Sequence, residues 1–176
     1  MNENEDSFIA RMKTLAQAGE YAWVERLPEG NIVQAEARLG FPLPSLLRRI
    51  YIEVGDGAFG LFPLNKEDFN GLCDMDLVES YLELRSSNWE ECDACESGSQ
   101  DRPLIWPEKL LIIYDWGCNI YSCLDCSKLA CPVLRNDNNI SVSTYSVEAP
   151  SFQLWLQALL DGTLDFDWET AEKVTF

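Results

Sequence analysis

Seven cysteines are the side chains of this sequence best suited to chemistry, and four of them form two CxxC pairs. Cys92 and Cys95 make the first pair, and Cys123 and Cys126 make the second. Four thiolates spaced in this way are a common ligand set for a structural zinc ion. Cys123 argues against this use, because it falls in a predicted strand, where neighbouring side chains point to opposite faces. Zinc bound by these four cysteines is therefore one interpretation among several.

Three other interpretations of the cysteines stay open. Cys118 and Cys131 lie close in sequence to Cys123 and Cys126, so these four offer a rival grouping. Neither CxxC pair sits in an evident zinc-knuckle turn. Free thiols packed as small core side chains are the simplest interpretation, because cysteine is among the most buried residue types. We therefore expect no cofactor, with zinc as the first alternative and a redox or disulfide role as the second.

The chain contains no histidine, which removes the commonest general base and every Ser-His or Cys-His nucleophile pair. The glycines of residues 55–60 follow a predicted helix and lack the lysine of a phosphate-binding loop. Carboxylate pairs are abundant, but 30 acidic residues produce such pairs by chance. We therefore expect a protein that is not an enzyme and has no small-molecule substrate. A zinc-stabilised or carboxylate-based enzyme is the least favoured alternative.

The formal net charge of −17, from 30 acidic and 13 basic side chains, points to the kind of partner. Nucleic acid is excluded as a partner, because its phosphates would be repelled, whereas a basic protein would be attracted. Residues 65–101 alone contain 11 acidic and 2 basic side chains, a local charge of −9. The bland alternative is that acidity only keeps the protein soluble.

An acidic helix-and-loop insertion around residues 65–102 is the predicted partner-binding surface. Trp89 and Trp106 flank its loop, and tryptophan is over-represented among residues that dominate binding energy. The alternative is that both indoles pack beneath the loop. The candidate contacts are Asp74, Glu79, Glu83, Trp89, Glu90, Glu91, Asp93, Glu96 and Trp106.

The spacing of apolar residues predicts a main helix over residues 43–54, with one face on a core. Pro44 suits its first turn, and Gly55 offers the left-handed conformation that ends helices. Residues 59–64 then follow a Gly-rich turn and are predicted to form the first strand. Two other helices are predicted before the main helix. The first covers residues 6–18 and is capped by Asp6 or Ser7. The second begins with a capping box at Asn31 and Gln34 and runs to Leu39, where Gly40 ends it.

The second half of the chain is predicted to be mainly strands. Asp76 can cap a helix through residue 85, and the continuous apolar run 110–116 suits a central strand covered on both faces. Residues 119–124, 131–135 and 140–147 are further strands. Ser151 caps a last helix, closed by Gly162, that should pack on the sheet.

The predicted fold is therefore α+β: a single domain over residues 1–176 with N-terminal helices and a mostly antiparallel sheet of about four to six strands. A C-terminal helix packs on that sheet. The longest apolar runs fall short of a bilayer span, and the first residues are acidic where a signal peptide is basic. We expect a cytoplasmic protein with reduced thiols and no membrane partner.

Residues 35–44, the helix that follows them, the turn Gly55-Asp56-Gly57 and residues 59–64 resemble the SUKH superfamily. Residues 113–118, Cys123-Leu124-Asp125 and Pro132-Val133 resemble its second motif. With the helix around Trp155-Leu156, the similarity covers most of the chain. One departure is the turn itself, since the family usually has an Asn-Gly-Gly-like sequence there.

The resemblance implies the same α+β arrangement and a function in binding. The superfamily includes many bacterial toxin-immunity proteins and a fungal regulator of cell-wall synthesis. The resemblance implies an immunity protein that neutralises a cognate toxin by occluding a basic surface of the toxin with its own acidic face. A nuclease is one candidate for the toxin. The alternative is an intracellular scaffold or regulatory domain without a toxin partner.

Overall fold

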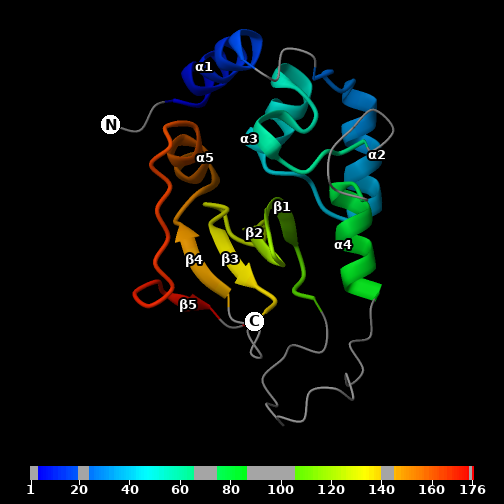
Figure 1. Ribbon diagram of the computed structural model, residues 1–176. Coiled ribbons are helices and arrows are strands. Elements are labelled where there is room, and N and C mark those ends of the chain that lie inside the picture. Colours follow the sequence, from blue (N-terminus) through cyan, green and yellow to red (C-terminus); the bar gives the residue numbers. More distant parts are fainter. Residues whose placement is uncertain (1–3, 20–23, 66–74, 87–105, 140–144, 175) are drawn as a thin grey trace. The chain divides into compact units, whose positions relative to one another are not determined.

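Figure 1 shows the computed structural model of the chain. The structure describes residues 4–19, 24–65, 75–86, 106–139, 145–174 and 176. The chain forms two compact units, Met1–Val78 and Glu79–Phe176. Among the described residues, the first unit is helical and the second contains the sheet. The prediction of one domain over residues 1–176 stays a prediction.

The first unit is built on the predicted main helix, which has two parts. α3 (Ser45–Arg49) continues directly into a π-helical turn (Ile50–Val54), and the N–H of Gly55 donates to the carbonyl of Ile50 at 2.9 Å. This five-residue spacing is the π-helical hydrogen bond. The predicted apolar face is buried at Leu43, Leu46, Leu47, Ile50, Tyr51 and Val54. The prediction of a core-facing helix here is confirmed.

The two earlier helices, α1 (Glu5–Ala18) and α2 (Glu29–Leu39), lie where they were predicted, but their caps differ. Asn4, not Asp6 or Ser7, caps α1, because its side-chain oxygen accepts from the N–H of Ser7 at 2.8 Å. The capping box at Asn31 is also wrong. α2 already begins at Glu29, where Pro28 supplies an extended conformation at the N-cap. Gly40 ends α2 with φ 80°, as predicted.

Gly55 is required for space rather than for a left-handed turn. Its φ of 164° is extended, so the predicted left-handed conformation is wrong. A Cβ at this position would lie 2.8 Å from Cγ1 and 3.2 Å from the carbonyl oxygen of Val24. The left-handed residue of this turn is Gly57, at φ 79°.

The predicted first strand over residues 59–64 is wrong. Residues Ala58–Gly60 form a short 3₁₀ helix, with Phe59 itself at φ 59°. The buried carboxylate of Asp56 accepts from the N–H groups of Leu64 at 2.6 Å and Asn65 at 2.9 Å. These bonds fold the segment back on its own turn, so the N–H groups of Leu64 and Asn65 are not available to a strand ladder.

Within the described residues, the second unit contains an antiparallel sheet of five strands in chain order. Figure 1 shows the strands of this sheet side by side. α4 (Leu77–Ser86) leads into it from the first unit, and α5 (Phe152–Leu160) follows the fourth strand. The strands are β1 (Leu110–Gly117), β2 (Ile120–Asp125), β3 (Val133–Asp137), β4 (Tyr145–Ala149) and β5 (Lys173–Val174). The predicted α+β class and the antiparallel sheet are therefore confirmed.

β1 is at one end of the strand order, so its predicted central position is wrong. Its first four residues are nevertheless all buried, which means that both faces are covered there. A continuous apolar run indicates that both faces of a strand are covered, but it does not indicate whether the strand has a neighbour on each side. β5 was not predicted, because two residues are too few to show a strand period.

α5 packs on the sheet as predicted. The side chain of Ser151 accepts from the N–H of Leu154 and caps the helix. Trp155 is fully buried, and its ring meets the ring of Tyr114 on β1 edge-on at 5.7 Å. No helix within the described ranges is long and apolar enough to cross a membrane.

Candidate functional site

The acidic side chains predicted to bind a partner fall mostly outside the described residues. Glu79 and Glu83 are described, and they lie one turn apart on α4, with Glu83 exposed. Their contribution to partner binding stays a prediction. Asp74, Trp89, Glu90, Glu91, Asp93 and Glu96 lie outside the described residues.

Trp106 is buried, so its predicted role as an exposed anchor is wrong. Its side chain is 6% exposed, and its ring N–H donates to the carbonyl of Leu110 at 2.7 Å. The indole also meets the ring of Tyr145 edge-on at 6.0 Å. An indole whose N–H finds a backbone acceptor loses little by leaving water. Trp106 therefore belongs to the core of the second unit.

Three hydrogen bonds join α4 to the segment 106–109, which follows the acidic loop. The Arg85 guanidinium, near the end of α4, donates to the carbonyl of Trp106 and to a carboxylate oxygen of Glu108 at 3.5 Å. The hydroxyl of Tyr81 accepts from the N–H of Lys109 at 3.2 Å. α4 is thereby attached to the segment that leads into β1.

A buried polar cluster lies across the sheet of the second unit. Arg135 and Glu148 form an ion pair whose side chains are 11% and 0% exposed. The Glu148 carboxylate also accepts from the hydroxyl of Ser122 at 2.6 Å, and that hydroxyl accepts from the ring N–H of Trp116 at 2.8 Å. Ser122 and Arg135 face one another in the β2–β3 register, so these polar groups share one face.

Two aromatic rings cover the Arg135 guanidinium. Its centre lies 4.4 Å from the ring centre of Trp116 and 4.9 Å from that of Phe166 in the C-terminal segment. Such contacts favour a partly desolvated cation. The Glu148 carboxylate accepts from Arg135 and Ser122, so it is held as a structural partner and not as a free base. The cluster therefore fixes the C-terminal segment to the sheet.

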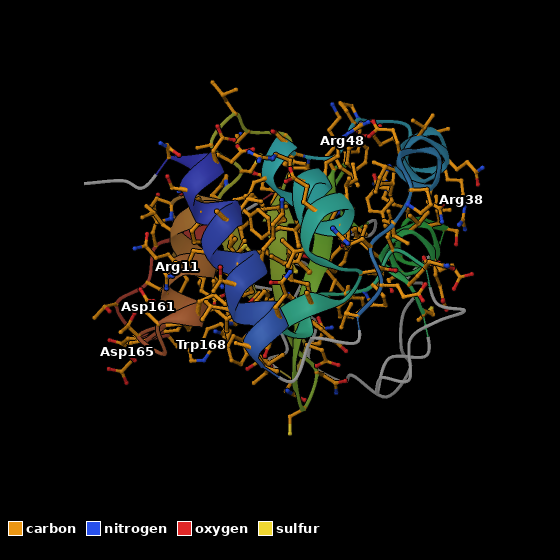
Figure 2. All side chains as sticks on the ribbon, turned by 90° about the horizontal axis from the view of Figure 1, so that it is seen from above. Arg11, Arg38, Arg48, Asp161, Asp165 and Trp168 are labelled. Carbon is orange, nitrogen blue, oxygen red and sulfur yellow. The ribbon has the colours of Figure 1, made fainter. Side chains whose placement is uncertain are left out.

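Exposed carboxylates follow α5 along the C-terminal segment: Asp161, Asp165, Asp167, Glu169 and Glu172. Figure 2 shows Asp161, Asp165 and Trp168 on this segment. The Asp167 carboxylate accepts from the N–H of Glu169 at 2.9 Å and the hydroxyl of Thr170 at 2.8 Å, and these bonds lower its pKa. Lys173 ties the segment to β4 through a 2.9 Å bond to Ser146.

The ion pairs of the first unit use its basic side chains internally. Arg49 bonds to Asp6 at 2.8 Å and to Glu53 at 2.7 Å, and Lys13 bonds to Glu53 at 2.5 Å. The bonds from Arg49 and Lys13 lower the pKa of Glu53. Arg48 pairs with Glu36 at 2.9 Å and with Glu29. These contacts connect α1 and α2 with α3 and the π-helical turn.

Two of the described cysteines, Cys123 and Cys126, have the properties of structural thiols. Burial raises the pKa of Cys123, which is fully buried in β2, and of Cys126, so neither is an activated nucleophile. Within the part of the chain that the structure describes, no three Cys, Asp or Glu side chains are grouped to hold a metal ion. Cys92 and Cys95 lie outside that part, so the four-cysteine zinc site stays a prediction.

Sequence reasoning missed the most organised polar groups of the second unit. The hydrogen bonds of Arg85 and the ion pair of Arg135 with Glu148 were not predicted. The available signal was two polar residues within otherwise buried strands, namely Ser122 and Arg135. Polar side chains at buried strand positions require partners, and that requirement predicts a cluster.

Comparison with protein families gives a match over most of both units. The model of the SMI1 / KNR4 family (SUKH-1) matches residues 26–158. This range runs from just before α2 to the last turns of α5. A search of curated proteins finds no match to the chain.

Proposed function

Because the chain belongs to the SMI1 / KNR4 family (SUKH-1), we propose that it is an immunity protein that neutralises a cognate bacterial toxin in the cytoplasm. The family is one of immunity-protein-like domains, which supports a role in binding another protein rather than in catalysis. The family match over residues 26–158 is the observation that carries this proposal.

The charge of the chain supports a basic partner. The net charge is −17, and Lys13, Arg48, Arg49, Arg85 and Arg135 are each engaged by carboxylates of their own unit. Five of the 13 basic side chains are thus paired within the fold, while carboxylates such as those of Asp165 and Glu169 are exposed. Such a protein attracts and orients a positively charged surface.

A nuclease is a toxin class that fits this complementarity. A nuclease holds a polyphosphate chain and so presents a basic groove. The acidic insertion around residues 65–102 would occupy that groove in place of the nucleic acid. The described residues that support this placement are Arg85 and Trp106, whose bond brings the two ends of the loop together. A loop whose two ends are held together loses less conformational entropy on binding than a loop with free ends.

The same family match supports a second candidate, an intracellular scaffold or regulatory domain without a toxin. Such a domain would bind several partners more weakly, because its binding surface would not be complementary to one target alone. It would also give cells no protection. These two properties separate the candidates by experiment.

The test begins with the purified chain immobilised and exposed to extract of its native cells at low salt. The captured protein, identified by mass spectrometry, is then expressed with and without this chain, and growth is measured. The proposal expects a basic protein that stops growth alone and permits growth in the presence of this chain. A captured protein that is acidic, or whose toxicity this chain does not relieve, contradicts the proposal.

A further inference from the structure

We propose that the exposed end of β1 is a docking surface for an arginine side chain of a basic protein partner, with Trp116 and Asp115 as its two contacts. The basic character of that partner rests on the proposed function. Three features of this end of the strand support the docking surface: a bulge in β1, an exposed indole that is already held in place, and a carboxylate beside it.

Trp116 is the extra residue of a bulge in β1. Asp115 pairs with Tyr121 and Gly117 pairs with Ile120, so Trp116 has no opposite residue in the described register with β2. A bulge interrupts the ladder and changes the direction of the side chains around it. β1 is also at one end of the strand order. The bulge therefore presents Trp116 on an edge strand of the sheet.

The indole of Trp116 is exposed and yet held in one orientation. It is 38% exposed, whereas Trp106 and Trp155 are buried. Its ring N–H donates to the hydroxyl of Ser122 at 2.8 Å, and the guanidinium of Arg135 lies over its ring. A side chain that is already ordered loses little entropy when a partner binds. Trp116 therefore has the properties of a binding anchor, which the sequence had suggested for Trp106.

The β1–β2 turn beside this indole is held by the β3–β4 turn. Cys118 and Asn119 both have left-handed backbones, with φ of 53° and 60°, a conformation that costs free energy in residues other than glycine. The side-chain amide of Asn139 donates to the carbonyl of Cys118. The N–H of Asn138 donates to the carbonyl of Asn119 at 3.0 Å. These bonds from a neighbouring turn give the exposed end of β1 a fixed shape.

The charges beside Trp116 fit a cation. Asp115 is exposed, and one of its carboxylate oxygens accepts from the N–H of Gly117 at 2.7 Å. Its second oxygen has no hydrogen-bond partner within the part of the chain that the structure describes. The charge of Arg135 is balanced by Glu148. An arginine of the partner can therefore lay its apolar stem on the indole and donate to the carboxylate of Asp115.

Titration of the full chain with a hexa-arginine peptide tests this docking surface. The chain is isotope-labelled at its indole nitrogens, and loss of a signal in Trp116→Phe identifies the Trp116 resonance in the NMR spectrum. That resonance should shift with added peptide and return with added salt, while those of the buried Trp106 and Trp155 stay in place. An unshifted Trp116 resonance overturns the proposal. Because no toxin is used, this result does not bear on the immunity function.

Variants separate this surface from a general attraction to negative charge. Asp115→Asn keeps the oxygen that accepts from Gly117 and should weaken peptide binding about 2- to 5-fold, and Trp116→Ala should weaken it about 5-fold or more. Circular dichroism checks folding, and Asp115→Asn decides the question if Trp116→Ala does not fold.

Two matched controls leave this surface intact. Glu25→Gln removes one exposed charge elsewhere. Leu129→Ala shortens the most exposed of the large apolar side chains in the described ranges, in the hairpin loop at the other end of β2. Neither control should change the affinity for the peptide. The proposal is overturned if Asp115→Asn has no larger effect than Glu25→Gln, or if a folded Trp116→Ala has no larger effect than Leu129→Ala.

Discussion

Arg135 and Glu148 show what a single pair of residues does for the sheet. Both charges are withdrawn from water, and withdrawal is expensive unless each charge meets the other and further hydrogen bonds. Ser122 supplies one such bond to Glu148, and Trp116 and Phe166 cover the cation. The pair therefore specifies how the C-terminal segment lies on the sheet. Its cost is that a substitution of either partner strongly destabilises the protein.

We predict that Glu148→Leu lowers the free energy of unfolding by roughly 3–5 kcal/mol, because it leaves the Arg135 charge buried without its partner. The double variant Arg135→Met, Glu148→Leu should recover most of this loss, since no unpaired charge remains. Urea denaturation of the two variants measures both values. A double variant as unstable as the single variant would show that the lost pairing is not the cause.

Glu53 gives a prediction for the dependence of stability on pH. Its folded-state pKa lies below the ordinary value of 4.5, chiefly because of the bond from Arg49 and then that from Lys13. A carboxyl with a lowered folded-state pKa stabilises the protein fully above the ordinary pKa, and this contribution is lost as pH falls through the folded-state value. Glu53→Gln should therefore cost about 1 kcal/mol at neutral pH and progressively less below pH 4.5.

Urea denaturation of Glu53→Gln and wild type at about pH 7, 5 and 3 measures this difference. The control is Glu25→Gln, which removes the same charge from an exposed position of the same unit. The control should match the wild type at each pH. A Glu53→Gln deficit that is constant with pH would contradict the proposed origin of the stabilisation.

At the scale of elements, the turn after the π-helical segment depends on close packing at Gly55. We predict that Gly55→Ala lowers the free energy of unfolding by about 1–3 kcal/mol, because the new methyl group meets Val24 at 2.8 Å. The control is Gly30→Ala in α2, where a Cβ meets nothing within 4 Å and alanine favours the helix. Thermal denaturation compares them. Equal stability of both variants would mean that the space around Gly55 is not limiting.

The elements that sequence reasoning predicted correctly are those with a strong periodic pattern and a local stop signal. The buried face of residues 43–54 and the α5 helix with its Ser151 cap are examples. The predicted strand over 59–64 failed because its outcome depended on Asp56, whose carboxylate takes the N–H groups of Leu64 and Asn65. Period and propensity contain no information about such a bond between residues eight or nine apart.

The candidate site was predictable only in part. Composition alone gave the acidic stretch around residues 65–102 and its sign of charge, and its role as an insertion that binds a partner stays a prediction. The burial of Trp106 was not predictable, because its acceptor, the carbonyl of Leu110, comes within reach only when the chain turns into β1. The cluster around Arg135 required the register of β2 with β3 and of β3 with β4. Register is a tertiary property that a single strand sequence leaves open.

For the whole molecule, the account depends on where the negative charge lies as well as on its amount. We predict that neutralising Glu90, Glu91, Asp93 and Glu96 to Gln or Asn slows association with the toxin and weakens its dependence on salt. The matched control neutralises four carboxylates of the C-terminal segment, Asp161, Asp165, Asp167 and Glu169, and changes the net charge equally. Stopped-flow association at several salt concentrations measures the rates.

The comparison of the two variants separates two explanations. A larger effect of the loop variant supports the insertion as the surface that meets the toxin. Equal slowing by both variants would attribute the effect to net charge alone. Unchanged association of the loop variant would refute the role proposed for the acidic insertion around residues 65–102, without bearing on the proposed immunity function.

The most direct test of the central claim is the growth of cells that produce the captured partner, measured with and without this chain. The account predicts that the partner alone stops growth, and that co-expression restores it without any chemical change to the partner. Growth that stays arrested in the presence of a folded, stoichiometric chain, or restoration that requires turnover of a substrate by the chain, would contradict it.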